Sequence, residues 1–280
     1  MPELPEIETI KNDLASKVIG KIITRVTFPP DPKIRILRRV HSAQDFINEL
    51  KGTKIQFLRR RAKYLIFDLI PSKSLVMHLG MSGQVRLEKS GIPYEPYIRA
   101  IFHFNNNTEL RFIDPRKFGE IFLKLPSSQS HPLILDRLGP EPLEKDFSLT
   151  YLSRILQKSR RAIKTLLLDQ KKITGIGNIY SDEILFRAKI HPTRLAYTLN
   201  GNEIKLLYRS IRQILKDAID NRGTTAADKR YRDGWGKEGK FQKKLKVYQR
   251  QGDPCYSCGT MIKSMRLGGR SASFCPQCQK

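Results

Sequence analysis

The sequence contains few acidic residues: 27 Asp and Glu stand against 52 Lys and Arg, which gives a formal net charge of +25 over 280 residues. An excess of positive charge of this size is typical of a protein that binds a polyanion. An anionic membrane surface would also match the charge, but no basic amphipathic segment with a broad apolar face is found. Nucleic acid is therefore the expected partner.

Long hydrophobic runs are also lacking. No apolar run approaches the roughly 18 residues that a membrane-spanning helix needs. The first eight residues hold three glutamates and two prolines, which is unlike a signal peptide. We expect a cytoplasmic, nucleoid-associated protein that is a monomer and does not bind membranes.

Cysteine is scarce, with four residues arranged as two Cys-x-x-Cys pairs. Cys255 and Cys258 form the first pair, Cys275 and Cys278 form the second, and 16 residues lie between the pairs. This spacing is typical of a zinc site, and four thiolates would make a closed, structural site for one Zn²⁺. A disulfide or a redox pair is the alternative, which a reducing cytoplasm disfavours.

The hydrophobic patterns of the first half predict an N-terminal β-sandwich with flanking helices. Ile7, Ile10 and Leu14 recur at helical spacing, and Gly20 would end this first helix. Alternating β-branched and aromatic residues then predict antiparallel strands, with a further helix at 44–50. The strand-like runs are 21–28, 53–69, 75–87, 98–104 and 109–125.

A segment rich in Pro and Ser, 126–142, separates this half from one with helical periodicity, and it is a candidate hinge. The helical runs are 149–156, 162–168, 181–188 and 202–219. The fold class is therefore α+β. The expected domains are a β-sandwich catalytic domain at 1–130, a helical DNA-binding domain at 131–245 and a four-cysteine zinc finger at 246–280.

The N-terminus carries a candidate nucleophile. Removal of Met1 would leave Pro2 as a secondary amine, and a terminal amine titrates near pH ~7.7–8.0, so part of it is unprotonated at neutral pH. Such an amine condenses with an aldehyde to a cationic iminium, which acts as an electron sink. Glu3 and Glu6 would share a helix face, where one could transfer protons. The alternative is an ordinary helix start, with Pro in the first turn and Glu at the positive end of the helix dipole.

Six blocks, spread over nearly the whole length, carry a resemblance to a known family. They are Met-Pro-Glu-Leu-Pro-Glu-Ile-Glu at 1–8, Arg-Arg-Ala-Lys-Tyr-Leu at 60–65, His-Leu-Gly-Met-Ser-Gly at 78–83, Asp-Pro-Arg-Lys-Phe-Gly at 114–119, Gly-Ile-Gly-Asn-Ile-Tyr at 175–180 and the four-cysteine module. In this order they resemble bacterial formamidopyrimidine-DNA glycosylase, a repair enzyme that excises oxidised purines. The resemblance implies that the helical half is a helix–two-turn–helix domain and that the partner is double-stranded DNA containing a damaged base.

The resemblance also implies the chemistry: excision of 8-oxoguanine and formamidopyrimidines, followed by strand cleavage through β,δ-elimination. Pro2 matches the residue that attacks the sugar and forms a Schiff base, and Glu3 would protonate the sugar ring. Lys63 matches a lysine that holds phosphate and serves as a general acid in β-elimination. Arg270, on a hairpin turn predicted at 267–270, matches a proton donor in δ-elimination. An arginine with a pKa above ~12 releases its proton reluctantly, so a phosphate clamp is the chemically safer role.

Met81, Arg116 and Phe118 match the triad that the family inserts into the duplex. Met81 lies in a Gly-Met-Ser-Gly turn, and the other two follow Pro115, so none shows the alternation of a strand core. An enzyme that extrudes a base must fill the gap left in the stack, and apolar side chains with an arginine would do so. Burial of Met81 and Phe118 beneath their turns is the alternative.

Further DNA contacts are expected on both halves of the chain. Asn178 follows Gly-Ile-Gly. Glycines and a helix N-terminus favour the binding of a phosphate group at such a position. A simple tight turn is the alternative. With the preceding Arg160 and Lys164, Asn178 resembles the helix–two-turn–helix clamp. His78 matches a contact to the DNA backbone. Tyr97 stands where the family usually has a histidine, which leaves that contact open.

Segment 224–241 occupies the position of the family's lesion-covering loop. Here it surrounds the only tryptophan, Trp235, which could stack on a base, and the alternative is a disordered loop. Two other functions remain. A non-enzymatic zinc-dependent DNA-binding protein would have no use for Pro2 beside Glu3. An endonuclease VIII-like glycosylase for oxidised pyrimidines would keep both, but tends to have Gly in place of Leu4 and a different wedge.

Overall fold

The computed structural model describes residues 1–29, 42–125 and 134–280 and divides into two compact units. Unit 1 comprises Met1–Pro132 and Asn221–Lys240, and unit 2 comprises Leu133–Asp220 and Phe241–Lys280. On sequence grounds, residues 221–240 are assigned to the helical domain. In the structure, Asn221–Lys240 belongs to unit 1 and packs on the sandwich. The first part of the expected linker, residues 126–133, lies outside the described residues.

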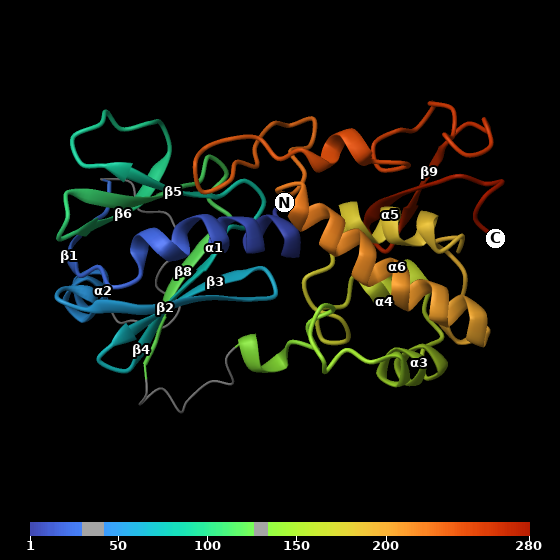
Figure 1. The fold of residues 1–280 in the computed structure, drawn as a ribbon, viewed down its shortest axis with the longest axis horizontal. Helices are drawn as coiled ribbons and strands as arrows, with labels where there is room; N and C mark the ends of the chain where they lie inside the picture. The colour runs from blue at the N-terminus through green and yellow to red at the C-terminus, as the bar shows by residue number, and fades with distance from the viewer. Residues whose placement is uncertain (30–41, 126–133) are drawn as a thin grey trace. The chain divides into compact units, whose positions relative to one another are not determined.

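Unit 1 contains the predicted antiparallel sandwich of two four-stranded sheets (Figure 1). One sheet has the strand order β1 (Ile23–Thr27), β6 (Ile98–Phe104), β7 (Thr108–Ile113) and β5 (Gln84–Lys89). The other has the order β2 (Lys54–Arg61), β3 (Tyr64–Ile70), β4 (Lys73–His78) and β8 (Glu120–Lys124). Alternate residues of both sheets point inward, as the period-2 pattern predicts. Phe67, Phe102 and Phe112 are completely buried in this core.

Two helices belong to the sandwich. Helix α1 (Leu4–Val18) buries Ile7, Ile10 and Leu14 against the core, which confirms the predicted first helix. In the view of Figure 1 it runs between β5 and β6 on one side and β2 and β3 on the other. Helix α2 (Ala43–Leu50) begins at Ser42, whose hydroxyl accepts the N–H of Asp45 as an N-cap. The core therefore fixes α1, and the start of α1 fixes the N-terminus.

Segment Asn221–Lys240 is held against α1 by buried polar groups. The Arg222 guanidinium pairs with Asp13 of α1 at 2.6 Å and with Asp233 at 2.5 Å. The hydroxyl of Tyr231 donates to the carbonyl of Arg222, and the Gly234 N–H donates to Asp13. Hydrogen-bonded ion pairs at partly buried positions hold a segment in one conformation. The structure thus overturns the interpretation of 224–241 as a disordered loop.

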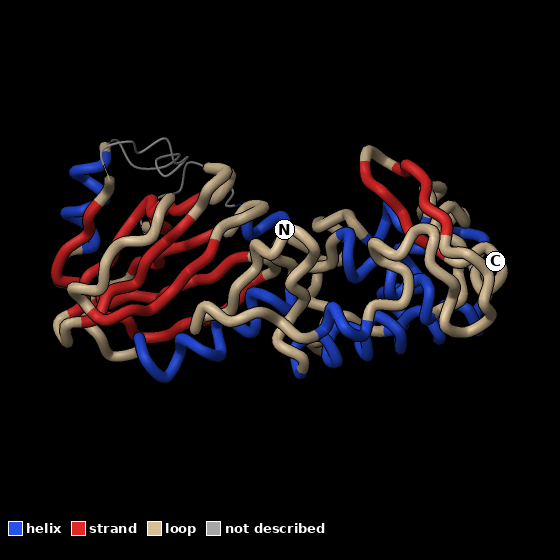
Figure 2. The backbone as a smooth tube through the Cα atoms, turned by 90° about the horizontal axis from the view of Figure 1, so that it is seen from above, coloured by secondary structure: helices blue, strands red, loops and turns tan. Residues whose placement is uncertain are grey.

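Unit 2 is mainly helical, with one β-hairpin near the C-terminus (Figure 2). Its helices are α3 (Leu149–Gln157), α4 (Ile163–Leu167), α5 (Asn178–Arg187) and α6 (Gly201–Asp220), with short 3₁₀ turns η1 (Ile134–Arg137), η2 (Ala196–Thr198) and η3 (Phe241–Lys244). Strands β9 (Lys263–Leu267) and β10 (Arg270–Phe274) pair antiparallel. Within the described ranges, no helix combines the length and the apolar character needed to cross a membrane.

Candidate active site

The N-terminal residues lie at the buried start of α1. Pro2 is buried and Glu3 is only 1% exposed, whereas Met1 is 37% exposed. Glu6 is not a second proton carrier pointing at open space. One of its carboxylate oxygens accepts the N–H of Glu3 and the other accepts the N–H of Thr224, each at 2.7 Å. Glu6 therefore fixes the backbone of the candidate catalytic residue.

Lys63 lies on the turn between β2 and β3, where Ala62 has a φ of 54°. Its side chain is largely buried in the structure. The neighbouring Arg60 donates to Glu8 of α1 at 2.7 Å and to the carbonyl of Ala62 at 3.1 Å. Burial opposes the negative charge of Glu8, but hydrogen bonds and attraction from Lys11 and Arg60 outweigh it and lower the pKa of Glu8. This bridge, which the sequence does not reveal, ties the turn of Lys63 to α1.

His78 ends β4 beside this turn. Its ring lies 4.7 Å from the ring of Tyr64, and its Nδ1 accepts the N–H of Gly80. Burial, and to a lesser degree the positive charge of Lys63, lowers the pKa of His78 to about 4. The imidazole is therefore neutral at neutral pH, with its proton on Nε2, because Nδ1 acts as an acceptor. His78 can donate one hydrogen bond but brings no charge.

The three wedge residues are exposed on two turns of unit 1. Met81 is 41% exposed and Phe118 is 45% exposed, so neither is buried beneath its turn. The Arg116 guanidinium lies over the Phe118 ring at 5.1 Å. Tyr97 is also exposed, at 56%, and has a φ of 70°. Exposed apolar groups beside a cation can enter a base stack.

In unit 2, the Gly-Ile-Gly-Asn turn joins α4 to α5 as predicted. Gln170, which no sequence signal marked, braces this turn by accepting the N–H of Gly175 and donating to the carbonyl of Ile176. Asn178 Nδ2 donates to Ser271 Oγ on β10 at 3.2 Å. Its Oδ1 is buried and has no hydrogen-bond partner among the described residues. Such an unsatisfied atom is typical of a site that water or a ligand completes.

Lys164 is the one predicted DNA contact whose position argues against direct contact. Its side chain is completely buried, and its Nζ lies 2.5 Å from Asp182 and 2.6 Å from the carbonyl of Ser271. A buried ammonium that is already paired cannot reach a phosphate without breaking that pair. Arg160 remains exposed, whereas Arg161 pairs with Asp169 at 2.8 Å. We therefore correct the role of Lys164 to that of a structural cation.

The four cysteines meet at the base of the β9–β10 hairpin, and their Sγ atoms all lie within 4.8 Å of one another. The measured Sγ–Sγ distances are 3.9 Å for Cys255 and Cys278, 3.5 Å for Cys258 and Cys275, and 3.4 Å for Cys258 and Cys278. Thiolates about 2.3 Å from a tetrahedral zinc ion lie about 3.8 Å apart, so this cluster fits such an ion.

Arg270 is exposed at the start of β10 and is paired with Leu267, as the predicted hairpin requires. Two glycines with positive φ, Gly268 and Gly269, form the turn. Left-handed backbone is readily available to glycine, so this pair suits the tight connection. The cluster therefore braces a hairpin whose tip presents a cation.

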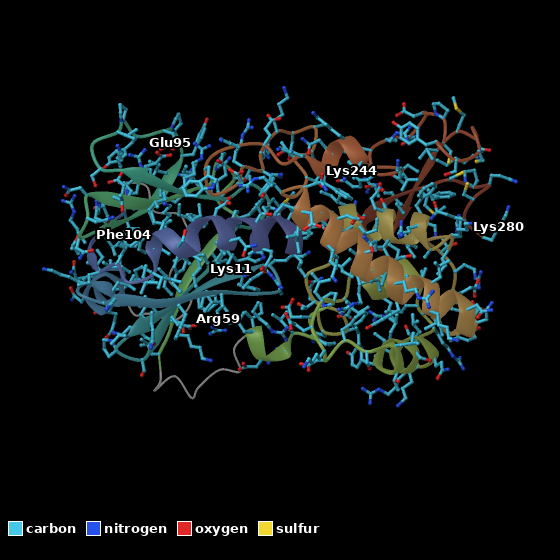
Figure 3. All side chains as sticks on the ribbon, viewed as in Figure 1. Lys11, Arg59, Glu95, Phe104, Lys244 and Lys280 are labelled. Atoms are coloured by element: carbon cyan, nitrogen blue, oxygen red, sulfur yellow. The ribbon has the colours of Figure 1, made fainter. Side chains whose placement is uncertain are left out.

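Unit 2 contains a pocket in which the candidate catalytic residues take no part. A pocket of about 870 Å³ lies in unit 2 between the C-terminal half of α5, α6 and η3, with Phe186, Ile214 and Phe241 in its lining. Of the predicted residues, only Cys278 lines it. Exposed Lys244, which Figure 3 labels, also lines this pocket. The candidate active site is instead the buried start of α1 in unit 1.

Three family models match the chain in order: the formamidopyrimidine-DNA glycosylase N-terminal domain at residues 1–121, the H2TH domain of the same enzymes at 138–229, and a zinc finger found in FPG and IleRS at 252–280. The chain belongs to the formamidopyrimidine-DNA glycosylase family and is a DNA repair enzyme.

Relatives match over the full length. The chain is 40% identical to the formamidopyrimidine-DNA glycosylase of Listeria innocua and 42% identical to that of Cytobacillus firmus, and in both comparisons all of each chain is covered. The crystal structure of the Thermus thermophilus protein superposes with a TM-score of 0.88 at 38% identity, covering 99% of this chain and 98% of that one. The Lactococcus lactis Fpg in complex with abasic-site DNA gives 0.89 at 36% identity, covering 99% of each.

Proposed function

We propose that this enzyme excises oxidised purines, namely 8-oxoguanine and formamidopyrimidines, from double-stranded DNA in the cytoplasm and then nicks the strand by β,δ-elimination. The observation that carries the proposal is Pro2 followed by the buried Glu3 at the start of α1. A processed Pro2 would be a secondary amine held beside a carboxyl group. That combination serves base excision and has no use in a protein that only binds DNA.

The proposed reaction begins when the Pro2 nitrogen bonds to C1′ of the sugar. The nitrogen displaces the damaged base, which leaves with the electron pair of the glycosidic bond, and the nitrogen then gives up its proton. Glu3 protonates the sugar ring oxygen, and the lone pair of the nitrogen expels that oxygen as a hydroxyl group, which opens the ring and yields an iminium between nitrogen and C1′. This electron sink acidifies C2′, so the 3′-phosphate leaves by β-elimination and the 5′-phosphate by δ-elimination. One nucleoside is thereby removed.

The remaining residues are proposed to hold the DNA. Lys63 binds phosphate and serves as a general acid in β-elimination, and Arg270 clamps phosphate during δ-elimination. His78 donates from Nε2 to the backbone, as its neutral ring allows. Arg160, Asn178 and Tyr97 supply further contacts. Lys164 supports the hairpin through Ser271 instead.

A second substrate class has one specific observation in its favour. A solved structure of the Lactococcus lactis enzyme, 36% identical to this chain, contains DNA with an oxidised pyrimidine. A mutant of that protein was also solved with DNA containing a formamidopyrimidine derived from guanine. Both base types are therefore found in complexes of similar chains. We nevertheless assign oxidised purines as the preferred substrate, because Leu4 and the Met, Arg and Phe wedge fit that branch.

The proposed function is tested by incubating purified protein with duplexes that carry either an oxidised purine or an oxidised pyrimidine, with borohydride present. A reduced covalent complex and faster cleavage of the purine duplex are expected. Faster cleavage of the pyrimidine duplex would assign the endonuclease VIII-like activity. Binding without any covalent complex or cleavage would contradict the enzymatic proposal altogether.

Phe118→Ala is expected to impair excision of a paired lesion by about tenfold or more, because extrusion costs a few kcal/mol that the inserted ring helps to offset. Cleavage at an abasic site, where little needs to be unstacked, should change far less. Single-turnover rates on both duplexes give the measurement. Phe57→Ala removes another exposed ring, from β2, and serves as the control. Equal losses on both duplexes would show that Phe118 only supports the fold.

Cys275→Ser is expected to remove the metal and to weaken DNA binding, while the sandwich stays folded. Purified wild-type protein should contain about one zinc ion per chain, because the cluster is a closed four-thiolate site. Metal content by mass spectrometry and affinity for an abasic-site analogue give the measurements. Ser257→Ala, which changes an exposed residue between two of the ligands, should retain zinc. Metal-free wild-type protein with full DNA affinity would contradict the prediction.

A further inference from the structure

Asp114 links the two turns that carry the wedge. It directly follows β7 and is only 1% exposed. Its Oδ1 accepts the hydroxyl of Ser82 at 2.7 Å and the N–H of Arg116 at 3.2 Å. Its Oδ2 accepts the N–H of Gly119 at 2.7 Å. One carboxylate therefore holds the residue after Met81 together with both ends of the turn that contains Phe118.

The backbone of Asp114 reaches a third segment. Its N–H donates to the carbonyl of Tyr97 at 3.0 Å, and its own carbonyl accepts from Arg99 Nε at 2.9 Å. Tyr97 is an exposed residue with a left-handed backbone, a conformation that needs support from its neighbours. Asp114 thus contacts three segments of unit 1: the turn of Met81, the turn of Phe118 and the segment of Tyr97. Each of these segments carries a residue to which a DNA contact is assigned.

The two wedge turns also touch through their backbones. Gly80 has a φ of 58°, and a Cβ placed there would lie 2.4 Å from the carbonyl oxygen of Phe118. A Cβ at Gly119 would lie 2.5 Å from the Phe112 ring in the core. Only glycine allows these approaches. The turns can therefore pack directly on each other and on the sandwich, with Asp114 supplying the polar connection.

We propose that Asp114 is a positioning residue that makes the two turns one rigid element, so that Met81, Arg116 and Phe118 enter the duplex together. A buried carboxylate that accepts three hydrogen bonds makes strong, directional contacts. Groups ordered before binding lose less conformational freedom when they insert. This inference rests on the proposed function, because it assigns the wedge a part in base extrusion. Asp114 is only 1% exposed and is assigned no contact of its own with the DNA.

Asp114→Asn tests this role. The amide keeps one acceptor oxygen, and an NH₂ group replaces the other. That NH₂ group then faces N–H or O–H donors whose hydrogen bonds the second oxygen accepts in the wild type. Excision of a paired oxidised purine is expected to fall by about 10- to 100-fold, because a small misplacement of positioned groups has effects of this size. Cleavage at a preformed abasic site should fall by no more than about threefold, since little extrusion is needed there.

Two further readouts separate positioning from general support of the fold. The rate of base unstacking, followed by a 2-aminopurine next to the lesion, should fall in parallel with excision. In the double variant Asp114→Asn/Phe118→Ala, the aspartate substitution should reduce excision by a smaller factor than it does alone, because one of the three groups that it positions is already gone. Ser82→Ala removes a single donor. It should lower the ratio of the excision rate to the rate of abasic-site cleavage, but less strongly than Asp114→Asn does. This variant keeps the test available if Asp114→Asn folds poorly.

Asp68→Asn is the matched control. Asp68, on β3, also accepts a serine hydroxyl, that of Ser74 at 2.7 Å, and it pairs with Arg59, yet it has no contact with the wedge turns. It should leave the ratio of the two rates unchanged. Equal loss on both duplexes with Asp114→Asn, or no loss on either, would overturn the inference. Absence of excision by the wild-type enzyme would instead overturn the proposed function.

Discussion

Protein that retains Met1, or that carries an N-terminal tag, is expected to lose borohydride trapping and strand cleavage by about a thousandfold or more, because an amide nitrogen cannot form the iminium. Met1 is exposed, whereas Pro2 is buried at the start of α1, so blocking the amine need not disturb the core. The chain of active enzyme should begin at Pro2. Intact-mass spectrometry, with trapping assays on the same preparation, gives the measurement.

Removing the tag with a protease that leaves Pro2 as the first residue should restore both activities, which is the control. Affinity for DNA should stay nearly unchanged throughout, because it depends on cations elsewhere in a chain with a net charge of +25. Trapping and cleavage by fully Met1-retaining protein, at the rate of the processed protein, would contradict the role of Pro2. Another amine would then be the nucleophile, and Lys63 is the next candidate.

Glu3→Gln is expected to separate base excision from strand cleavage. Excision of an oxidised purine should fall by about 10²- to 10⁴-fold, because the amide cannot donate the proton that opens the sugar ring. Borohydride trapping at a preformed abasic site should stay within severalfold, since that sugar already offers an aldehyde to Pro2. Glutamine has nearly the size of glutamate, which suits a side chain only 1% exposed.

The two substrates serve as each other's control for Glu3→Gln. A misfolded variant would lose both reactions. We expect Glu3→Gln to fold normally, so its thermal unfolding should agree closely with that of the wild type. Single-turnover excision and trapping, measured with the same enzyme preparation, give the result. An equally large loss of trapping at the abasic site would show that Glu3 is needed for attack by Pro2 as well, and would contradict the proposed division of labour.

Much of the fold could be predicted from the sequence, because helices and strands repeat over short distances. The run 98–104 was predicted as a strand and is β6, and the pattern from Ile7 predicted α1. The run 53–69 was less clear, since it holds both β2 and β3. Their turn is at Ala62, a non-glycine residue with left-handed backbone, so no glycine or proline marked it.

The candidate site could be predicted only in part. Pro2, Glu3 and the four cysteines could be named as candidates, because a proline next to a glutamate and paired cysteines are visible as local patterns. Gln170 and the bridge from Arg60 to Glu8 were not found, since their partners are known only once the chain has folded. Lys164 was assigned to DNA because its segment resembles the helix–two-turn–helix clamp, and only the folded structure places its side chain in the interior beside Asp182.

The sequence by itself determined most of the elements and the four-cysteine cluster, and it marked the N-terminus as a candidate nucleophile, because periodicity, ligand spacing and residue chemistry depend on near neighbours. The tertiary structure decided which polar groups work together. Asp13 and Arg222 are more than two hundred residues apart and form an ion pair, and Ser82 and Asp114 come from different turns. Such pairs depend on how α1 and the sheets pack, and no pattern of adjacent residues encodes that arrangement.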